Sequence, residues 1–329
     1  MTPDDPEALA AAAAELAQQP VVAIARAGNG ANSQTFRVSL ASHVLALKVY
    51  PERHGDRRDR LNTEWNALSL LRARGIDAVP APIARDDRRG LMLMEWLVGD
   101  PVVAHRDADL DDAIAFMVRV MGLSNDSRAT PFGLASEACL SATEIVRQIE
   151  ARLAALASHP YLDRFLRETF LVAYAEAKHA LASELRQSKV LPEKRRRLIP
   201  ADFGFHNAMR HANGTLRYID FDYFGWDDPV KLATDFILHP SMTLSSHDRQ
   251  KVRTGIATAL ADDSDFAARL DRHLGLYALR WALILLNSFR RDRIGLLADD
   301  PKEREARFIT QLRKADALVV ASSARHAEL

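Results

Sequence analysis

Cysteine is almost absent from this sequence, and neither sign of charge is in excess. Cys139 is the only cysteine among 329 residues, which excludes a disulfide framework within the chain and argues against a cysteine-based zinc site. Lysine plus arginine and aspartate plus glutamate both total 44, so the formal net charge is +0. General binders of nucleic acid or anionic membranes carry a basic excess, so the composition argues against both functions.

Long hydrophobic runs and a basic N-terminal segment are also missing. No stretch approaches the roughly 20 apolar residues of a membrane-spanning helix. The first segment is rich in alanine but carries Asp4, Asp5 and Glu7, where a signal peptide needs positive charge. We therefore expect a capped amphipathic helix here, and a cytoplasmic protein, since a single cysteine suits a reducing compartment.

The apolar pattern divides the chain into a β-rich first part and a longer helical part. Hydrophobic residues make up 48% and charged residues 27% of the chain, the balance of a globular protein. Strand-like segments run from Pro20 to "GLMLMEWLVGD", and helical periodicity dominates from about Asp107, with a β-like stretch from Leu198 to Asp222. We expect an N-terminal lobe over residues 1–98 and a mostly helical lobe over residues 99–329.

The stretch "LIPADFGFHNAMR" raises the question of which loop it forms, because Asp202-Phe203-Gly204 spells the magnesium loop of a protein kinase. Such a loop should follow a D-x-x-x-x-N catalytic loop, yet residues 175–197 contain neither Asp nor Asn. Asp202 and Asn207 themselves have that spacing, and a strand-like "LRYID" ends downstream at Asp220. The order therefore predicts that Asp202 belongs to a catalytic loop and Asp220 to a metal loop, and that the DFG spelling is a coincidence.

These residue types suit phosphoryl transfer, which needs a positioned acceptor hydroxyl and neutralised phosphate charge more than covalent chemistry. The Asp202 carboxylate can orient a hydroxyl and take its proton. Asn207 and Asp220 offer the oxygen ligands that Mg²⁺ prefers. We expect Asp202, Asn207 and Asp220 to be catalytic, and Asn207 and Asp220 to hold the metal.

The first lobe supplies residues for a nucleotide. In "HVLALKVY", Lys48 ends a strand face on which it can pair with phosphates, and Glu64 on the following helix can hold it by an ion pair. A Gly/Asn-rich turn can cover the phosphates with its backbone N–H groups, and "LMEWLV" is placed to bond adenine as a hinge. The expected contacts from these two segments are Gly28, Gly30, Asn32, Ser33, Met94, Glu95 and Leu97.

The motifs "DFGFHN" and "YIDFDYFGWDDPVKLATDF", in this order, resemble the aminoglycoside phosphotransferase and choline kinase family over most of residues 20–290. Ile219 to Asp222 match the family's I-D-[FW]-[ED] motif, and Asp235 fits its last position. Pro200 stands where the family usually has a histidine. The resemblance implies an α+β, bilobal protein-kinase-like fold, a donor of ATP with Mg²⁺, and a small-molecule hydroxyl acceptor.

The acceptor is not identified by the sequence. In the family it binds between the catalytic loop and the C-terminal helices, which makes Asp222, Trp226, Asp228 and Arg280 the candidate contacts. Acidic clusters are few and scattered, which disfavours a polycationic aminoglycoside and favours a sugar, an amino alcohol or a similar metabolite. The alternative function is a regulatory pseudokinase that binds a nucleotide but is catalytically weak. A protein kinase is disfavoured because no A-P-E signature follows Asp220.

One basic run leaves two interpretations open. Lys194 to Arg197 form four consecutive cations just before the β-like stretch. The run resembles a phosphate-binding segment, but a solvated approach to the catalytic strand is the favoured interpretation.

Overall fold

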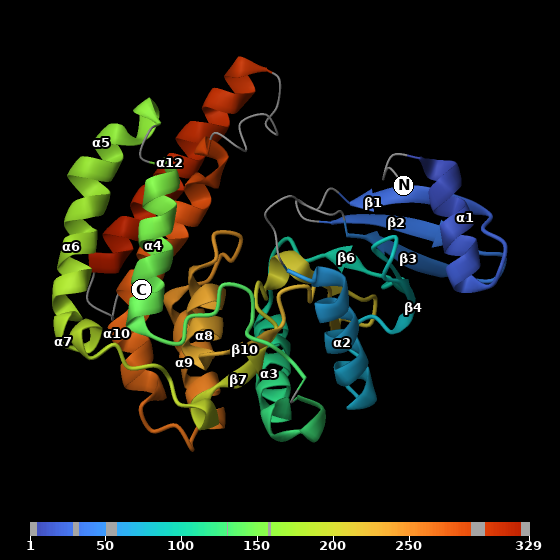
Figure 1. Cartoon of the computed structure of the whole chain (residues 1–329), viewed down its shortest axis with the longest axis horizontal. Helices are drawn as coiled ribbons and strands as arrows, with labels where there is room; N and C mark the ends of the chain where they lie inside the picture. Colours follow the sequence, from blue (N-terminus) through green and yellow to red (C-terminus); the bar gives the residue numbers. More distant parts are fainter. Residues whose placement is uncertain are drawn as a thin grey trace. The chain divides into compact units, whose positions relative to one another are not determined.

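The computed structural model of the chain describes residues 5–28, 33–50, 58–129, 131–156, 159–290 and 300–323 (Figure 1). Packing divides the chain into two compact units. Unit 1 comprises Met1–Ser136 and Pro200–Gly225, and unit 2 comprises Glu137–Ile199 and Trp226–Leu329. The boundary expected after residue 98 concerns lobes rather than compact units, and it stays a prediction.

Unit 1 contains a five-stranded antiparallel sheet with the order β1-β2-β3-β5-β4. Its strands are β1 (Ala23–Gly28), β2 (Gln34–Ser39), β3 (Val44–Val49), β4 (Pro82–Asp86) and β5 (Leu91–Glu95). Four of these strands follow the predicted pattern. The residues of β4 have no strand-like pattern of their own, because Pro80 and Pro82 interrupt the chain there. β4 lies at the edge of the sheet, where a proline costs no ladder hydrogen bond.

Helix α1 (Pro6–Ala17) covers one face of this sheet. The Asp5 side chain caps its first turn by accepting hydrogen bonds from the N–H groups of Glu7 and Ala8. Its buried face joins a core with apolar residues of β2, β3 and β5, including Leu47 and Leu93. Because side chains alternate along a strand, Lys48 points to the opposite face of the sheet from Leu47. Helix α2 (Arg60–Ala73) supplies Glu64 there, so the alternation of β3 fixes the direction of the lysine.

The rest of unit 1 carries the two predicted loops. It contains α3 (Asp107–Gly122), the short 3-10 turns η1 (Leu123–Asn125), η2 (Ser127–Ala129) and η6 (Phe205–Asn207), and a small sheet of β6 (Asp100–Pro101), β8 (Ala208–Arg210) and β9 (Leu216–Tyr218). Strands β8 and β9 form a hairpin whose turn contains Asn213-Gly214, a dipeptide that favours tight hairpins. The hairpin brings Asn207, the last residue of η6 just before β8, opposite the residue after β9: the Ile219 N–H donates to the Asn207 carbonyl at 2.9 Å.

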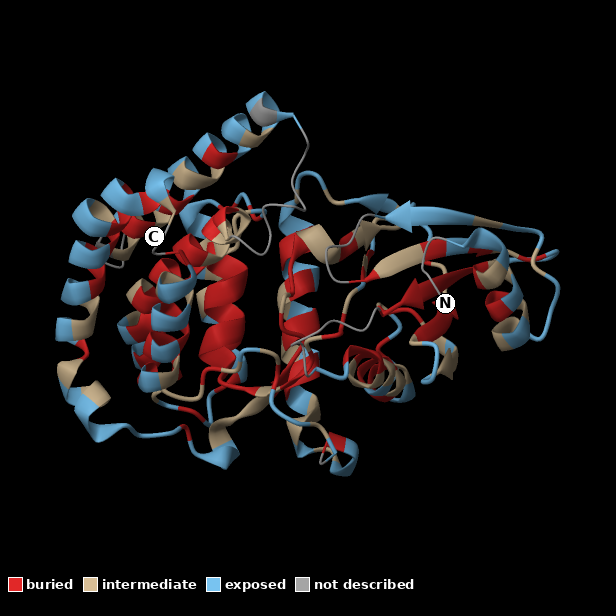
Figure 2. Ribbon diagram, turned by 45° about the horizontal axis from the view of Figure 1, so that its top comes forward, coloured by how far each residue is buried: buried red, intermediate tan, exposed pale blue. Residues whose placement is uncertain are grey.

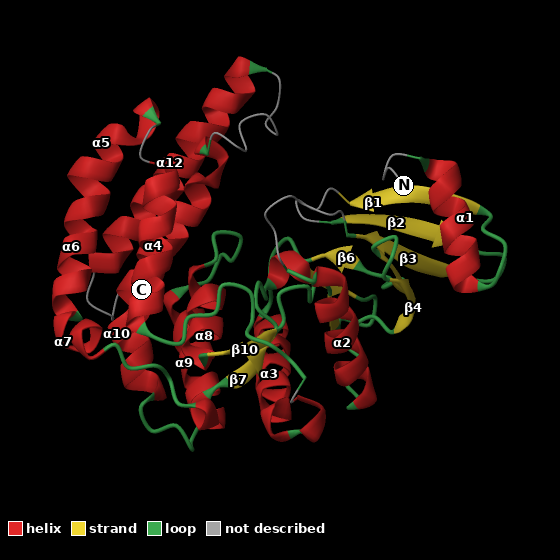
Figure 3. Ribbon diagram, viewed as in Figure 1, coloured by secondary structure: helices red, strands yellow, loops and turns green. Residues whose placement is uncertain are grey.

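Unit 2 is built mainly from helices, as the colouring of Figure 3 shows. The long helices α10 (Phe266–Leu285) and α12 (Pro301–Ser323) pack on each other, and α10 also contacts α4 (Ala142–Leu156) and α8 (Pro229–Leu238). Every residue of α8 is buried (Figure 2). The remaining elements are η3 (Pro160–Leu162), α5 (Asp163–Phe165), the π-turn η4 (Leu166–Phe170), α6 (Leu171–Ala180), α7 (Ala182–Gln187), η5 (Glu193–Arg195), β7 (Arg197–Ile199), β10 (Gly225–Asp227), α9 (Ser246–Ala259) and η7 (Leu286–Phe289).

The predicted change from a β-rich to a helical pattern is confirmed, and so is the β-like interruption, which contains β7, β8 and β9. The periodic stretch from Phe165 to Leu185 differs in detail, because it divides into α5, η4, α6 and α7. A π-turn inserts one residue into the helical repeat, which the periodicity alone does not reveal. None of the helices in the part of the chain that the structure describes is both long and apolar enough to cross a membrane.

Candidate active site

The centre of the candidate site is Lys48, which lies between two carboxylates of unit 1. Its Nζ is 2.6 Å from Glu64 Oε2 on α2 and 2.7 Å from Asp220 Oδ1 on the loop after β9. The predicted ion pair of Lys48 with Glu64 is therefore present. Lys48 and Glu64 are buried, whereas the Asp220 side chain keeps 36% exposure. The lysine thus joins the sheet, α2 and the predicted metal loop at a point that solvent reaches.

Helix α2 holds the predicted metal loop through Arg60 and Glu64. The sequence analysis did not identify Arg60, and it expected Glu64 only to pair with Lys48. Arg60 and Glu64 lie one turn apart and share a face. The Arg60 guanidinium donates to Asp222 Oδ2 at 2.5 Å, and Glu64 Oε1 accepts the Phe221 N–H at 3.2 Å. Glu64 therefore orders both Lys48 and the backbone of the metal loop.

Arg60 and Tyr50 are the functional candidates that the sequence reasoning did not find. The Tyr50 hydroxyl donates to Glu64 Oε2 at 2.7 Å. This oxygen therefore accepts hydrogen bonds from both Tyr50 and Lys48. Two signals point to these residues in retrospect. Tyr50 follows Lys48 by two residues in an extended segment, and Arg60 precedes Glu64 by one helical turn.

The charges at this site are set by mutual contact. Burial alone lowers the pKa of Lys48, but the carboxylates of Glu64 and Asp220 reverse this and raise it. Burial raises the pKa of Asp220, and the charge of Lys48 overcomes this and lowers it below its usual value. Burial, followed by the neighbouring charge of Asp220, raises the pKa of Asp222 to about 7. Of the two carboxylates of the loop, Asp220 is thus the one whose ionised form its surroundings favour.

The predicted catalytic loop has an unusual backbone at its first residue. Asp202 has φ 61°, and Asp220 has φ 71°, both in the left-handed region that non-glycine residues enter at a cost. The Asn207 side-chain Nδ2 donates to the Asp202 carbonyl at 3.0 Å, which leaves the Asn207 Oδ1 atom as the acceptor. His206 Nε2 lies 3.5 Å from Asp202 Oδ1. The loop is therefore fixed by its own side chains and leaves the Asp202 carboxylate 38% exposed.

Phe203 serves the core rather than the site. Its ring stacks on Phe116 with centroids 5.1 Å apart and lies 4.8 Å from the ring of Tyr218. Gly204 has φ 172°, an extended conformation that any residue adopts. The packing of Phe203 against Phe116 and Tyr218 holds the loop in the core. A phenylalanine next to Asp202 is therefore explained by packing and needs no metal-binding role.

The residues predicted to contact the nucleotide lie partly within the described ranges. Gly28 ends β1, and Ser33 is buried just before β2. Gly30 and Asn32 lie outside the described residues. Met94 and Glu95 end β5, and Leu97 is buried two residues further on. Glu95 pairs its backbone N–H with the Ala81 carbonyl at 2.9 Å. The role of these residues in nucleotide binding stays a prediction.

The candidate acceptor contacts fall in both units. Asp222 belongs to unit 1, and Trp226, Asp228 and Arg280 belong to unit 2. Trp226 is half-buried in β10. Asp228 is buried and caps α8 by accepting the Val230 N–H at 2.9 Å. It also accepts two hydrogen bonds from Arg269, at 2.9 and 3.0 Å. Their role towards an acceptor stays a prediction.

Arg280 has the partners that a charge inside an apolar helix requires. Its guanidinium donates to Gln148 Oε1 at 2.8 Å, to Glu137 Oε2 at 2.7 Å and, at 3.4 Å, to Asp235 Oδ1. The neighbouring Trp281 Nε1 also donates to Asp235, at 2.8 Å. Burial raises the pKa of Glu137, and the charges of Arg280 and of a second arginine outweigh this and lower it. Arg280 therefore ties α10 to α8 and α4 within unit 2.

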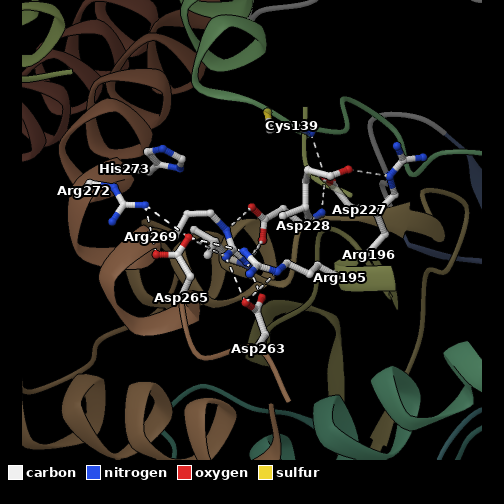
Figure 4. A network of polar contacts seen from close by, with 12 residues as sticks. Cys139, Arg195, Arg196, Asp227, Asp228, Asp263, Asp265, Arg269, Arg272 and His273 are labelled. Carbon is white, nitrogen blue, oxygen red and sulfur yellow. Dashed lines mark hydrogen bonds and ion pairs between the residues drawn. The ribbon is translucent and has the colours of Figure 1, made fainter. Parts of the chain in front are cut away.

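Asp227 begins a second buried cluster, next to α8. Its carboxylate accepts the N–H groups of Cys139 and Asp228, each at 2.8 Å (Figure 4). It also lies 3.8 Å from Lys231 Nζ. Burial raises the pKa of Asp227 to about 7, against the charge of Lys231. Burial also raises the pKa of the Cys139 thiol to about 12, which fits the buried, unreactive cysteine expected from the sequence.

The pKa of Asp227 predicts how stability depends on pH. The folded protein keeps this carboxyl protonated up to about pH 7, whereas the unfolded chain releases the proton near its ordinary pKa of 3.8. The stabilisation is thus complete at acid pH and is lost as the pH rises towards 7. The substitution Asp227→Asn removes this titration, so the variant should not lose the stabilisation as the pH rises. The free energy of unfolding of Asp227→Asn minus that of the wild type should therefore be about 2–3 kcal/mol larger at pH 8 than at pH 5.

Urea unfolding of both proteins across this pH range measures the difference. The exposed Asp316→Asn on α12 is the matched control in unit 2 and should give a difference that does not vary with pH. A pH-independent difference for Asp227→Asn as well would show that Asp227 is ionised in the folded protein throughout.

The fold and site together define a class of protein: a phosphotransferase built on the protein-kinase-like fold. A model of the phosphotransferase enzyme family, APH, matches residues 23–270. Because this match spans most of the chain, the protein belongs to that family and is a small-molecule kinase. The resemblance stated from the sequence motifs is thereby confirmed. A search among curated proteins gave no significant match.

Solved structures confirm the predicted fold class. A spectinomycin phosphotransferase in complex with ADP and spectinomycin is 12% identical, with a TM-score of 0.66 over 98% of this chain and 99% of that chain. The choline kinase LicA from Streptococcus pneumoniae is 14% identical, with a TM-score of 0.62 over 96% and 99%. An ADP-bound aminoglycoside phosphotransferase, APH(2'')-Ib, is 15% identical, with a TM-score of 0.55 over 93% and 99%. At these identities the likeness shows the fold alone.

Proposed function

We propose that this protein transfers the γ-phosphoryl group of ATP to a hydroxyl group of a small molecule, with Mg²⁺ bound at the metal loop. The observation that carries the proposal is the Lys48 constellation, in which Nζ lies 2.6 Å from Glu64 and 2.7 Å from Asp220. A buried lysine held in this way presents a fixed positive charge to phosphate oxygens. Family membership supports the same activity.

The donor set fits a magnesium ion. Asp220 supplies an ionised, partly exposed carboxylate, and Asn207 supplies an amide oxygen whose orientation is fixed by the hydrogen bond from Nδ2 to the Asp202 carbonyl. Hard oxygen ligands of this kind are what Mg²⁺ prefers. When bound, the ion neutralises charge on the phosphate oxygens.

Asp202 is the proposed catalytic carboxylate. Its side chain is 38% exposed and lies in a loop that Asn207 and the packing of Phe203 keep in place. A carboxylate in this position orients the acceptor hydroxyl and accepts its proton as the phosphoryl group is transferred. Loss of Lys48, Asp202 or Asp220 would have favoured the regulatory pseudokinase, and all three residues are present.

The acceptor class is proposed from charge. The candidate contacts in unit 2 include Asp228 and Arg280, whose charges are already matched by Arg269 and by Glu137. A polycation needs a pocket with unneutralised acidic charge, and these paired residues do not supply it. We therefore propose that the acceptor is a sugar, an amino alcohol or a similar metabolite. We also retain the cytoplasmic location as a prediction.

The test is an ADP-release screen with ATP and Mg²⁺ against sugars, amino alcohols and nucleosides. An acceptor that raises ADP release well above the rate with water, in the wild type but not in Asp202→Asn, supports the proposal. ADP release that stays at the level of the Asp202→Asn protein with every acceptor class would favour the pseudokinase.

Lys48 and Glu64 are expected to act as a unit in this reaction. Because both contribute to one phosphate contact, the double substitution to alanine should cost much less ATP-dependent turnover than the sum of the two single substitutions, with a coupling energy on the order of 1–3 kcal/mol. The measurement is kcat/KM for ATP in all four proteins.

The exposed pair of Arg164 in α5 and Glu168 in η4, 2.9 Å apart, is the matched control. Its two alanine substitutions should be additive and nearly neutral, as for surface ion pairs. Additivity at Lys48 and Glu64 too would refute their joint role.

A further inference from the structure

Unit 2 contains an open cavity of about 750 Å³, a volume in the range of small-molecule sites. Its walls come from α7, the segment 189–195 and the start of α10. Lys48, Asp202, Asn207 and Asp220 do not line it. Of the candidate acceptor contacts only Asp228 lines it, and both of its carboxylate oxygens accept hydrogen bonds from Arg269.

The basic run that the sequence left unexplained divides at this cavity. Arg197 is used by the fold: it pairs with Asp262 at 2.6 Å and donates to the Lys194 carbonyl. Arg196 donates to the Leu191 carbonyl at 3.2 Å. Lys194 and Arg195, in contrast, line the cavity. Arg196 and Arg197 therefore stabilise the segment that leads into β7, whereas Lys194 and Arg195 line the cavity.

The floor of the cavity is a network of arginines in which two guanidinium groups often share one carboxylate, so that not every guanidinium has a close ion pair. Arg269 is buried and makes short bonds to Asp228 and Asp263, the latter at 2.8 Å. Arg195 shares Asp263 with it at 3.5 Å, as Figure 4 shows. Arg269 thus takes the best acceptor positions, which leaves Arg195 only a long contact with this carboxylate.

Arg272 is in the same situation on the other side. It shares Asp265 with Arg195, at 3.4 and 3.7 Å (Figure 4). It also lies 3.4 Å from Glu184. Glu184 is already engaged at 2.6 Å by the buried His273. Arg195 and Arg272 therefore hold positive charge that their long ion pairs neutralise only in part.

Two lysines add to this charge at the rim. Lys189 and Lys194 line the cavity, and neither makes an ion pair or a side-chain hydrogen bond within the part of the chain that the structure describes. Among the described residues that line the cavity, five side chains are permanent cations and three are carboxylates. The wall is thus cationic even before His273 is counted.

We propose that this cavity binds a small polyanion, a molecule with two or more phosphate or carboxylate groups, apart from the proposed catalytic and metal-binding residues. Arg195 and Arg272 bond its anionic groups, because planar guanidinium groups offer paired N–H donors. Lys189 and Lys194 close over it from the rim. The buried Arg269 holds the floor in place through Asp228, which also caps α8.

Isothermal titration of the full chain in metal-free buffer tests the proposal, with pyrophosphate and citrate as probes. Each probe should bind the wild type, and the tighter one tells whether phosphate or carboxylate groups are preferred. Lys189→Ala with Lys194→Ala should weaken binding by roughly tenfold or more, since charged hydrogen bonds are lost. Both lysines are exposed and unpaired in the described structure, so folding should be unaffected.

The matched control is Arg88→Ala with Arg186→Ala, which removes two exposed cations outside the cavity. It should bind both probes as the wild type does, and the lysine variant should hydrolyse ATP with water at the wild-type rate. Equal losses in both double variants, or no binding of either probe to the wild type, would overturn the proposal. A lysine variant with intact probe binding would do the same.

Discussion

Asp202→Asn is expected to lower phosphotransfer turnover by roughly two to four orders of magnitude, the usual range for loss of an acid–base group, while ATP binding stays nearly intact. Asparagine is the informative replacement because Asp202 has φ 61°, and asparagine enters the left-handed region as readily as aspartate does. The loop should keep its shape, with Asn207 still donating to the carbonyl of residue 202. The loss would then report the carboxylate charge alone.

Turnover and nucleotide binding are measured side by side on wild type and variant. Asp107→Asn, an exposed substitution at the start of α3 in the same unit, is the control and should leave both unchanged. If Asp202→Asn keeps more than half of the wild-type turnover, Asp202 is not the catalytic carboxylate.

The second large effect is expected at Asp220, where substitution should abolish metal-dependent nucleotide binding. Mg²⁺ requires carboxylate charge, and Asp220 is the ionised carboxylate next to Lys48. Nucleotide affinity of the wild type should rise when Mg²⁺ is added, whereas Asp220→Ala should show no such rise. Since Asp220 has φ 71°, alanine also adds backbone strain on the order of 1–2 kcal/mol.

Two further variants separate charge from backbone. Asp220→Asn keeps the left-handed residue type but loses the charge, so it should lose the Mg²⁺ response as Asp220→Ala does. Gly204→Ala changes the DFG spelling at an extended residue, and it should affect stability or loop shape but not the Mg²⁺ response. A Mg²⁺ response that is lost in Gly204→Ala and kept in both Asp220 variants would reverse the assignment of the two loops.

Much of this site could be predicted because its signals are local or depend on chain order. The alternation of β3 sets the face of Lys48, and helical spacing sets that of Glu64, so their contact at 2.6 Å follows from two short segments. The roles proposed for Asp202 and Asp220 rest on what lies upstream of each residue. The α+β, protein-kinase-like fold followed from the motifs.

Other features depend on tertiary contacts that no short segment encodes. Nothing in the sequence around Arg60 indicates its partner, because Asp222 comes from a loop far along the chain and lies 2.5 Å away only in the folded protein. β4 could not be predicted because its first residue is Pro82, which a strand tolerates at the edge of a sheet, and the edge position is known only from the fold. The division of the basic run between Arg197 and Lys194 is set by Asp262 and the cavity, which come from other elements.

The most direct test of the central claim is a crystal structure with a non-hydrolysable ATP analogue and Mn²⁺ in place of Mg²⁺, located by its anomalous scattering. We expect the metal to be bound by a carboxylate oxygen of Asp220 and by the Asn207 side-chain oxygen, at the ~2 Å of hard cations with oxygen ligands, and the Asp202 carboxylate to remain free for the acceptor. A metal bound by Asp202 alone, with Asp220 more than about 5 Å away, or over two coordination bond lengths, would contradict the account.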